Sequence, residues 1–167
     1  MTYSSTRRKL YAFGAAVIIA FSPLTITPVF AFDPASPSEI NTDTTGVAIR
    51  GFDPVAYFTD GKPTQGNSQF SAKFENGTYH FATAANRDAF VKEPAKYAPA
   101  YGGFCAFAAS VSKKADGNPA LWKIVDNKLY LNVNETAFNR WQQDIPGNLT
   151  KANTNWPNIS KKAPKDL

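Results

Sequence analysis

The chain has 167 residues, with 18 Lys or Arg, 13 Asp or Glu, one Cys and one His. A single Cys excludes a disulfide within the chain, and a zinc site made only of Cys and His needs about four ligands, where this chain has two. The length suits one domain. Few side chains are therefore left to carry thiol or metal chemistry.

The first 31 residues have the pattern of a secretory signal peptide. Basic residues at 7–9 precede twelve uncharged residues at 10–21, and Val29 and Ala31 are small enough for the −3 and −1 positions of a cleavage site. We expect cleavage after Ala31 and export to a bacterial periplasm. The paired Arg also loosely resembles a twin-arginine signal. The alternative is an uncleaved membrane anchor, but prolines and hydroxyl residues leave its apolar core too short for a stable span.

Much of the positive charge belongs to that segment. Without residues 1–31 the chain has 15 basic and 13 acidic residues, so the net charge falls from +5 to +2. Binding of nucleic acid needs a clustered basic face, and the Lys residues at 160–167 read instead as a solvated, frayed tail. We expect no nucleic-acid partner, and membrane contact only through the export signal.

The rest of the chain divides into a Pro- and Ser-rich lead at 32–43, expected to be flexible, a domain at 44–159 and the basic tail. Apolar periodicity, capping residues and turn pairs predict short elements in the domain, with no internal repeat. The first part has a strand at 47–49, one helical turn at 55–58 capped by Asp53, a hairpin at 68–74 and 78–82 turned at Asn76-Gly77, and helices at 84–91 and 94–97. A flexible joint at 101–103 and a buried run of undecided state at 104–110 follow. The last part has a hairpin at 122–125 and 129–132 turned at Asp126-Asn127, a helix at 134–144 stopped by Pro146-Gly147, and a helix at 149–155.

This mixture of hairpins and helices indicates a small single α+β domain. Three segments also resemble the YHS domain, a small family found in metal-handling and heavy-metal transport proteins: FDPVAY at 52–57, YHFATAANRDAF at 79–90 and EPAKY at 93–97. More closely, the chain resembles exported YHS-domain proteins, through YGGFCAFA at 101–108, WKIVDNKLYLN at 122–132, DIPGN at 144–148 and NWP at 155–157. The resemblance covers about residues 44–159 and implies a YHS-like fold.

The resemblance does not carry over a set of metal ligands. Metal-binding YHS members have Cys shortly after the Asp-Pro pair and in a Phe-Cys-x-x-x-Cys arrangement, where thiolates can converge on one soft cation. This chain has Ala56, Ala82 and Asn86 at those places. The resemblance therefore implies the fold of the YHS domain and not its metal ligands.

Two side chains remain candidates for metal chemistry. His80 is the only imidazole and Cys105 the only thiol, and together they could bind copper, another transition metal or haem iron. The alternatives are a half-buried, hydrogen-bonded His80 and an inert Cys105 among apolar neighbours. A Cys105 nucleophile with His80 as base is a further alternative, but no third orienting residue accompanies the pair. Other candidates could give oxygen ligands or the ring walls of a pocket: Asp53, Tyr57, Tyr79, Tyr97 and Tyr101.

Three functional hypotheses follow. The leading one is an exported, non-catalytic YHS-domain binding protein for a small ligand, a metal ion such as copper or a metal-containing cofactor, with His80 and Cys105 as ligands. The second is a structural or interaction module that kept the fold and lost the metal site. The third is a thiol-dependent enzyme. The identity of the ligand, any protein partner and the oligomeric state are open.

Overall fold

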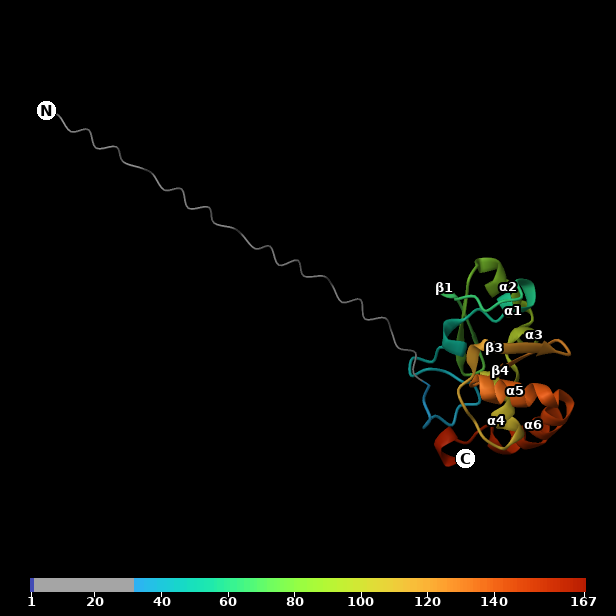
Figure 1. Ribbon diagram of the computed structural model, residues 1–167. Helices are drawn as coiled ribbons and strands as arrows, with labels where there is room; N and C mark the ends of the chain where they lie inside the picture. The colour runs from blue at the N-terminus through green and yellow to red at the C-terminus, as the bar shows by residue number, and fades with distance from the viewer. Residues whose placement is uncertain (2–31) are drawn as a thin grey trace.

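Short helices alternate with two hairpins along the chain (Figure 1). The computed structural model describes Met1 and residues 32–167, so the predicted signal peptide lies outside the described part. The elements are η1 (Ile49–Gly51), α1 (Ala56–Thr59), β1 (Asn67–Phe74), β2 (Gly77–Phe81), α2 (Ala84–Lys92), α3 (Pro94–Tyr97), η2 (Ala100–Gly103), α4 (Ala106–Ser110), β3 (Asn118–Val125), β4 (Lys128–Asn132), α5 (Glu135–Gln143), α6 (Ile145–Ile159) and η3 (Pro164–Asp166). β1 pairs with β2 and β3 with β4, both antiparallel. The predicted single α+β domain is confirmed.

The order of elements is repeated, although the sequence analysis found no internal repeat. η1-α1-β1-β2-α2-α3 is followed by η2-α4-β3-β4-α5-α6. The strand pairing repeats as well, because each hairpin has one pair of residues at its open end, then a bulge, then a regular ladder. The pairs on either side of the bulge are Asn67–Phe81 and Ser71–His80 in the first hairpin, and Asn118–Asn132 and Trp122–Leu131 in the second.

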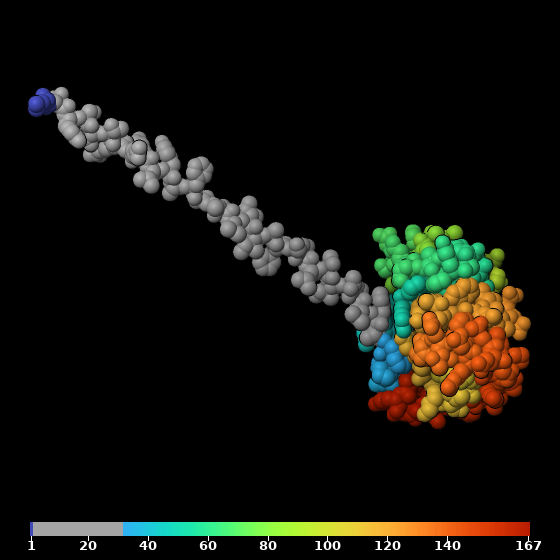
Figure 2. Space-filling model, in the orientation of Figure 1, coloured from blue at the N-terminus to red at the C-terminus, as the bar shows by residue number. Residues whose placement is uncertain are grey.

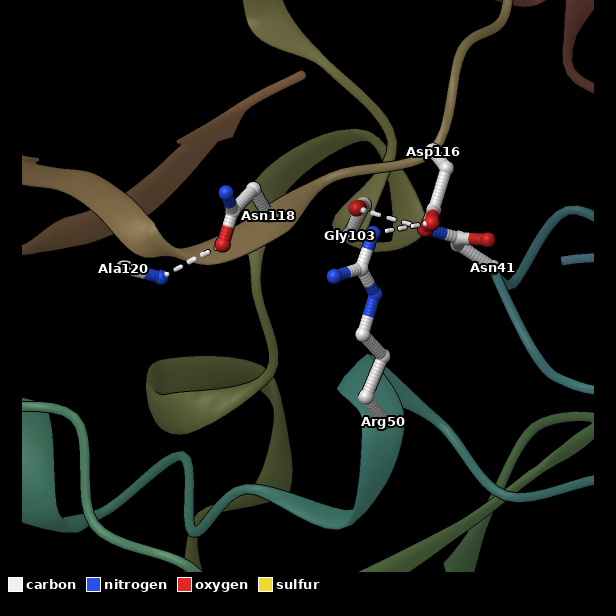
Figure 3. Close-up of polar contacts among 6 residues, drawn as sticks. All are labelled: Asn41, Arg50, Gly103, Asp116, Asn118 and Ala120. Carbon is white, nitrogen blue, oxygen red and sulfur yellow. Dashed lines mark hydrogen bonds and ion pairs between the residues drawn. The ribbon is translucent and has the colours of Figure 1, made fainter. Parts of the chain in front are cut away.

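The same side chains fix the start of both hairpins. The Asn67 side chain accepts a hydrogen bond from the N–H of Gln69 at 2.9 Å. From Asn67 to Asn118 is an offset of 51 residues, and Asn118 accepts the corresponding bond from the N–H of Ala120 at 3.0 Å (Figure 3). The two local turns are therefore the same structure, and the domain consists of two similar halves.

Each half opens on a left-handed turn. The φ angles of Ile49, Arg50 and Gly51 are 44°, 54° and 74°, and those of Tyr101, Gly102 and Gly103 are 53°, 60° and 84°. Such angles are uncommon outside glycine. The two turns touch, since a Cβ on Gly103 would lie 2.9 Å from Cγ2 of Ile49. The expected strand at 47–49 is thus replaced by single bridges and this turn. At 101–103 the expected flexible joint is a packed turn.

A polar contact also joins the halves to the lead. The Arg50 guanidinium pairs with the carboxylate of Asp116, just before β3 (Figure 3). The Asn41 amide donates to Asp116 at 2.9 Å and to the carbonyl oxygen of Gly103 at 3.2 Å. Three segments that are distant in the sequence therefore meet at one carboxylate.

Two main apolar clusters form the core. The first surrounds the β1–β2 hairpin and α2 and also takes in side chains of β4, with Ile49, Tyr57, Tyr79, Phe81, Phe90, Leu129 and Leu131 among its members. The second lies under α5 and α6 and contains Tyr101, Ala106, Ala109, Tyr130, Trp141 and Ala152. Tyr79 and Phe81 lie on the same face of β2, and both are fully buried in the first cluster.

Several predicted elements are confirmed, and the second hairpin turns where expected. Asp126 and Asn127 take φ angles of 49° and 58°, as a type I′ turn requires. In the first hairpin the turn lies one residue earlier than predicted, at Glu75 and Asn76, because Phe74 pairs with Gly77. Gly77 starts β2, where a Cβ would lie 2.9 Å from Cγ2 of Ile40. That glycine permits close packing and is not a turn residue.

The helix predicted at 134–144 is confirmed as α5, which ends at Gln143, but Pro146-Gly147 lies inside the next helix and not in the break between helices. Pro146 lies in the first turn of α6, where its missing N–H is not needed. The Asp144 carboxylate caps this helix by accepting from the N–H of Gly147 at 2.9 Å. α6 then runs for 15 residues, past Pro157, and replaces the short helix predicted at 149–155.

The lead and the tail pack against the domain, contrary to the expected flexible lead and frayed tail. Ile40 is buried in the first cluster. The ammonium group of Lys114 donates to the carbonyl oxygens of Ser38, Ser160 and Lys162 at 2.7, 2.8 and 2.9 Å. Lys114 is buried, and this desolvation lowers its pKa to about 8. Because carbonyls at the end of a helix lack intrahelical donors, the buried ammonium can hold the lead and the C-terminal tail side by side (Figure 2).

Candidate functional site

The three places where the YHS resemblance would put thiolates converge on one buried carboxylate. Asp53 is fully buried before α1. One of its oxygens accepts from the N–H groups of Val55 at 2.8 Å and Ala56 at 3.3 Å. The other accepts from the N–H of Ala82 at 2.9 Å and from the Asn86 amide at 2.7 Å. Ala56, Ala82 and Asn86 therefore lie around one point, and Asp53 caps α1 as predicted.

This Asp53 cluster offers no open position for a metal ion. Ala56 and Ala82 contribute backbone N–H groups and Asn86 contributes its side-chain amide, so none of the three residues supplies a thiolate, and the amide donates to the carboxylate. Both carboxylate oxygens already accept two hydrogen bonds each. The donor set suits a closed structural cluster and does not suit a soft metal ion.

Cys105 holds the corresponding position in the second half. Cys105 directly precedes α4, whereas two residues separate Asp53 from the start of α1. The Cys105 sulfur accepts a hydrogen bond from the N–H of Ala108 at 3.4 Å. The backbone N–H of Asp53 donates to Thr64 and that of Cys105 to Ala115, both at 2.9 Å. Cys105 is thus a helix cap in the same setting as Asp53.

The surroundings of Cys105 favour a protonated, inert thiol. The side chain is fully buried, and its sulfur donates to the Asn132 amide oxygen at 3.5 Å. Burial raises the pKa of the thiol, against the weaker opposing effect of backbone N–H groups at Ala108, Val133 and Phe107. A reactive cysteine needs an exposed thiol with a lowered pKa. The geometry therefore favours the buried, apolar alternative over the nucleophile.

Native protein is expected to resist alkylation at Cys105. Iodoacetamide at pH 8 should modify less than a tenth of the chains in an hour, because the thiol is buried and its pKa is raised. The same reagent in 6 M guanidinium should modify the chain completely, and intact-mass spectrometry reads both. Rapid stoichiometric modification of folded protein would return Cys105 to the list of nucleophiles.

His80 lies on the outer face of the first hairpin, away from Tyr79 and Phe81. It is half-buried, and desolvation lowers its pKa, with the charge of Asp43 acting in the opposite direction. Its Nδ1 atom borders Gly51, where an added Cβ would lie 3.3 Å away. The neutral form that metal binding requires is therefore favoured, but this side chain needs further ligands to form a site.

No hydrogen bond or shared apolar cluster links His80 with Cys105. Cys105 belongs to a small cluster with Ala108 and Ala137, whereas His80 borders the loops at Gly51 and Gly66. Across residues 32–167, no group of three or more His, Cys, Asp or Glu side chains gathers into a possible metal site. In the same stretch, no helix has the length and apolarity to cross a bilayer.

A groove of about 400 Å³ lies between the two halves. Its first side comes from the lead, the β1–β2 turn and the segment after α3, and its other side comes from β4 and α6. Its lining includes four aromatic and three charged side chains: Phe74, Tyr101, Tyr130, Trp156, Glu39, Glu75 and Lys128. This volume falls in the range of small-molecule sites, which often lie between domains.

Sequence analysis found only one part of this groove. Tyr101 was a candidate for a pocket wall, and it does line the groove. Tyr57 and Tyr79 are instead fully buried in the core, and the Tyr57 hydroxyl donates to the carbonyl oxygen of Pro119 at 2.9 Å. No pattern in the sequence indicated that Glu39 and Trp156 line a common groove, because the two residues are more than 100 positions apart.

Comparison with protein-family models, with curated proteins and with solved structures finds no match for the chain. The YHS resemblance therefore depends on the sequence motifs alone.

Proposed function

We propose that this chain is an exported, non-catalytic binding module of the YHS type that has lost the family's metal site and binds a small ligand between its halves. One observation carries the proposal. Ala56 comes from one segment and Ala82 and Asn86 from another, and all three donate hydrogen bonds to Asp53, yet none of them has a side chain that binds a soft metal ion. The groove is the remaining candidate for ligand binding.

Metal titration tests this function. Protein comprising residues 32–167 should bind Cu(I), Cu(II), Zn(II) and haem no more tightly than a Kd of about 10 μM. The triple variant Ala56→Cys, Ala82→Cys, Asn86→Cys should gain stoichiometric Cu(I) or Zn(II) binding, because it restores thiolates at the three positions where the YHS resemblance implies them. Calorimetry measures the affinity of the parent protein and of the triple variant, and metal analysis after gel filtration measures how much metal each retains.

Controls separate this site from the other candidate ligands. The titrations are repeated with the Cys105→Ala change in both proteins, and circular dichroism checks that the variants fold. Tight metal binding by the parent protein that disappears in His80→Gln and Cys105→Ala would contradict the proposal. It would instead support a copper or other transition-metal site at His80 and Cys105.

A further inference from the structure

We propose that the groove between the two halves binds a small organic ammonium ion. Its charge would face Glu39 and Glu75, and its apolar body would lie against the rings of Tyr101, Tyr130 and Trp156. This inference rests on the proposed function, because it names the class of ligand for the same groove.

The aromatic side of the groove is a continuous set of inclined rings. The Tyr101 ring has its centroid 5.8 Å from that of Tyr130 and 5.5 Å from that of Trp156, with interplanar angles of 51° and 57°. The Tyr101 hydroxyl donates to the Asn153 side chain at 2.9 Å, which fixes the ring. Inclined rings can place more than one π-face around a single cation.

The charged side of the groove is predominantly negative. Glu39 is half-buried, and only one of its carboxylate oxygens is engaged, by the Ser160 hydroxyl at 2.9 Å. In the part of the chain that the structure describes, neither Glu39 nor Glu75 forms an ion pair. The Lys128 ammonium is occupied by the carbonyl oxygen of Ala95 at 2.6 Å. A ligand with one positive charge would offset the excess of carboxylate.

The same aromatic cluster already accommodates an ammonium group. The Nζ atom of Lys114 lies 4.4 Å from the centroid of the Phe104 ring and 6.0 Å from that of Trp156. Phe104 and Trp156 pack at 6.0 Å between centroids. A partly desolvated ammonium is therefore stable against these rings, and a ligand cation would use the part of the cluster that lines the groove.

The chemistry disfavours other classes of ligand. An anion would approach two carboxylates, and this like-charge contact is unfavourable. A neutral ligand would fill the aromatic side but make no charge contact with Glu39 and Glu75, which outnumber Lys128 in the lining. A cation with a compact apolar part would make contact with both sides of a groove of about 400 Å³.

Three probes of similar size test the charge. Phenethylammonium, 2-phenylethanol and phenylacetate are titrated into residues 32–167, with binding followed by tryptophan fluorescence and calorimetry. We expect phenethylammonium to bind with a Kd below about 1 mM, at least tenfold tighter than the alcohol, and phenylacetate not to bind. Trp156→Phe should abolish the fluorescence change and keep the calorimetric signal, because an aromatic ring remains.

Charge variants provide the matched control. The double variant Glu39→Gln, Glu75→Gln should weaken phenethylammonium binding at least tenfold, whereas Glu135→Gln, which lies on α5 outside the groove, should leave it unchanged. Equal binding of the ammonium and the alcohol, or an unchanged Kd in the double variant, would overturn the proposal.

The outcomes distinguish this inference from the proposed function. If the alcohol or the carboxylate binds best, the groove is a ligand site of another charge class, so the cation inference fails and the proposed function stands. If none of the three probes binds, the cation inference also fails. The metal titration then tests the other part of the proposed function, the loss of the metal site, independently, because that part depends on Asp53 and its neighbours and not on the groove.

Discussion

Replacing Asp53 with Ala is expected to lower the free energy of unfolding by roughly 3–5 kcal/mol, the range for removing one partner of a buried charged network. The change leaves the backbone N–H groups of Val55 and Ala82 and the side-chain amide of Asn86, which come from two segments, without their acceptor. Each unsatisfied buried donor costs about 1–3 kcal/mol, and the loss of the α1 cap adds to this. Urea denaturation followed by circular dichroism measures the change.

Asp144→Ala is the matched control, because Asp144 also caps a helix but lies at the surface. Loss of that cap alone should cost about 1 kcal/mol. A similar small cost for both substitutions would mean that Asp53 is only a cap and does not link the segments at Val55, Ala82 and Asn86. The structure predicts a larger loss of unfolding free energy for Asp53→Ala than for Asp144→Ala.

Gly102→Ala is expected to destabilise the protein by roughly 3–4 kcal/mol, towards the upper end for single substitutions. Gly102 has a φ of 60°, and an added Cβ would lie 1.9 Å from the carbonyl oxygen of Glu39. The lead would have to move away, which would break the 2.8 Å hydrogen bond from the N–H of Asn41 to Gly102. The same movement would displace Glu39 from the groove, so phenethylammonium binding should weaken as well.

Gly61→Ala isolates the cost of the backbone angle. Gly61 has a φ of 64° and no atom within 4 Å of an added Cβ, so only the left-handed conformation opposes Ala. That conformation costs roughly 1–2 kcal/mol. Thermal denaturation of the two variants side by side should show the larger loss for Gly102→Ala. Equal losses would argue against the packing of the lead on η2.

Local signals in the sequence predicted most of the elements. Thr83 and Asn134 cap α2 and α5, and Asp126-Asn127 forms the expected turn, because each depends on one side chain and the next few backbone groups. The errors arose where distant contacts decided the outcome. Gly77 was assigned to a turn because its contact with Ile40, 37 residues earlier, has no local signal.

The repeat was missed because the halves share positions of structural importance and few identical residues. Asp53 and Cys105 both cap a helix, one with a carboxylate and the other with a thiol. A comparison of residue types along the sequence therefore does not reveal that the two positions are equivalent. The candidate site shows the same limit. The motifs identified the segments around Asp53, whereas the groove required the folded lead and α6.

The buried Lys114 has a consequence for the order in which the protein can fold. Its ammonium depends on acceptors at Ser38 and at Ser160 and Lys162, which are among the first and last parts of the domain to be synthesised. A chain emerging with its N-terminus first therefore has no complete set of partners for this charge until residues 160–162 have been synthesised. Truncation before Ser160 is expected to hinder the closure of the domain, because it removes two of the three acceptors of the Lys114 ammonium.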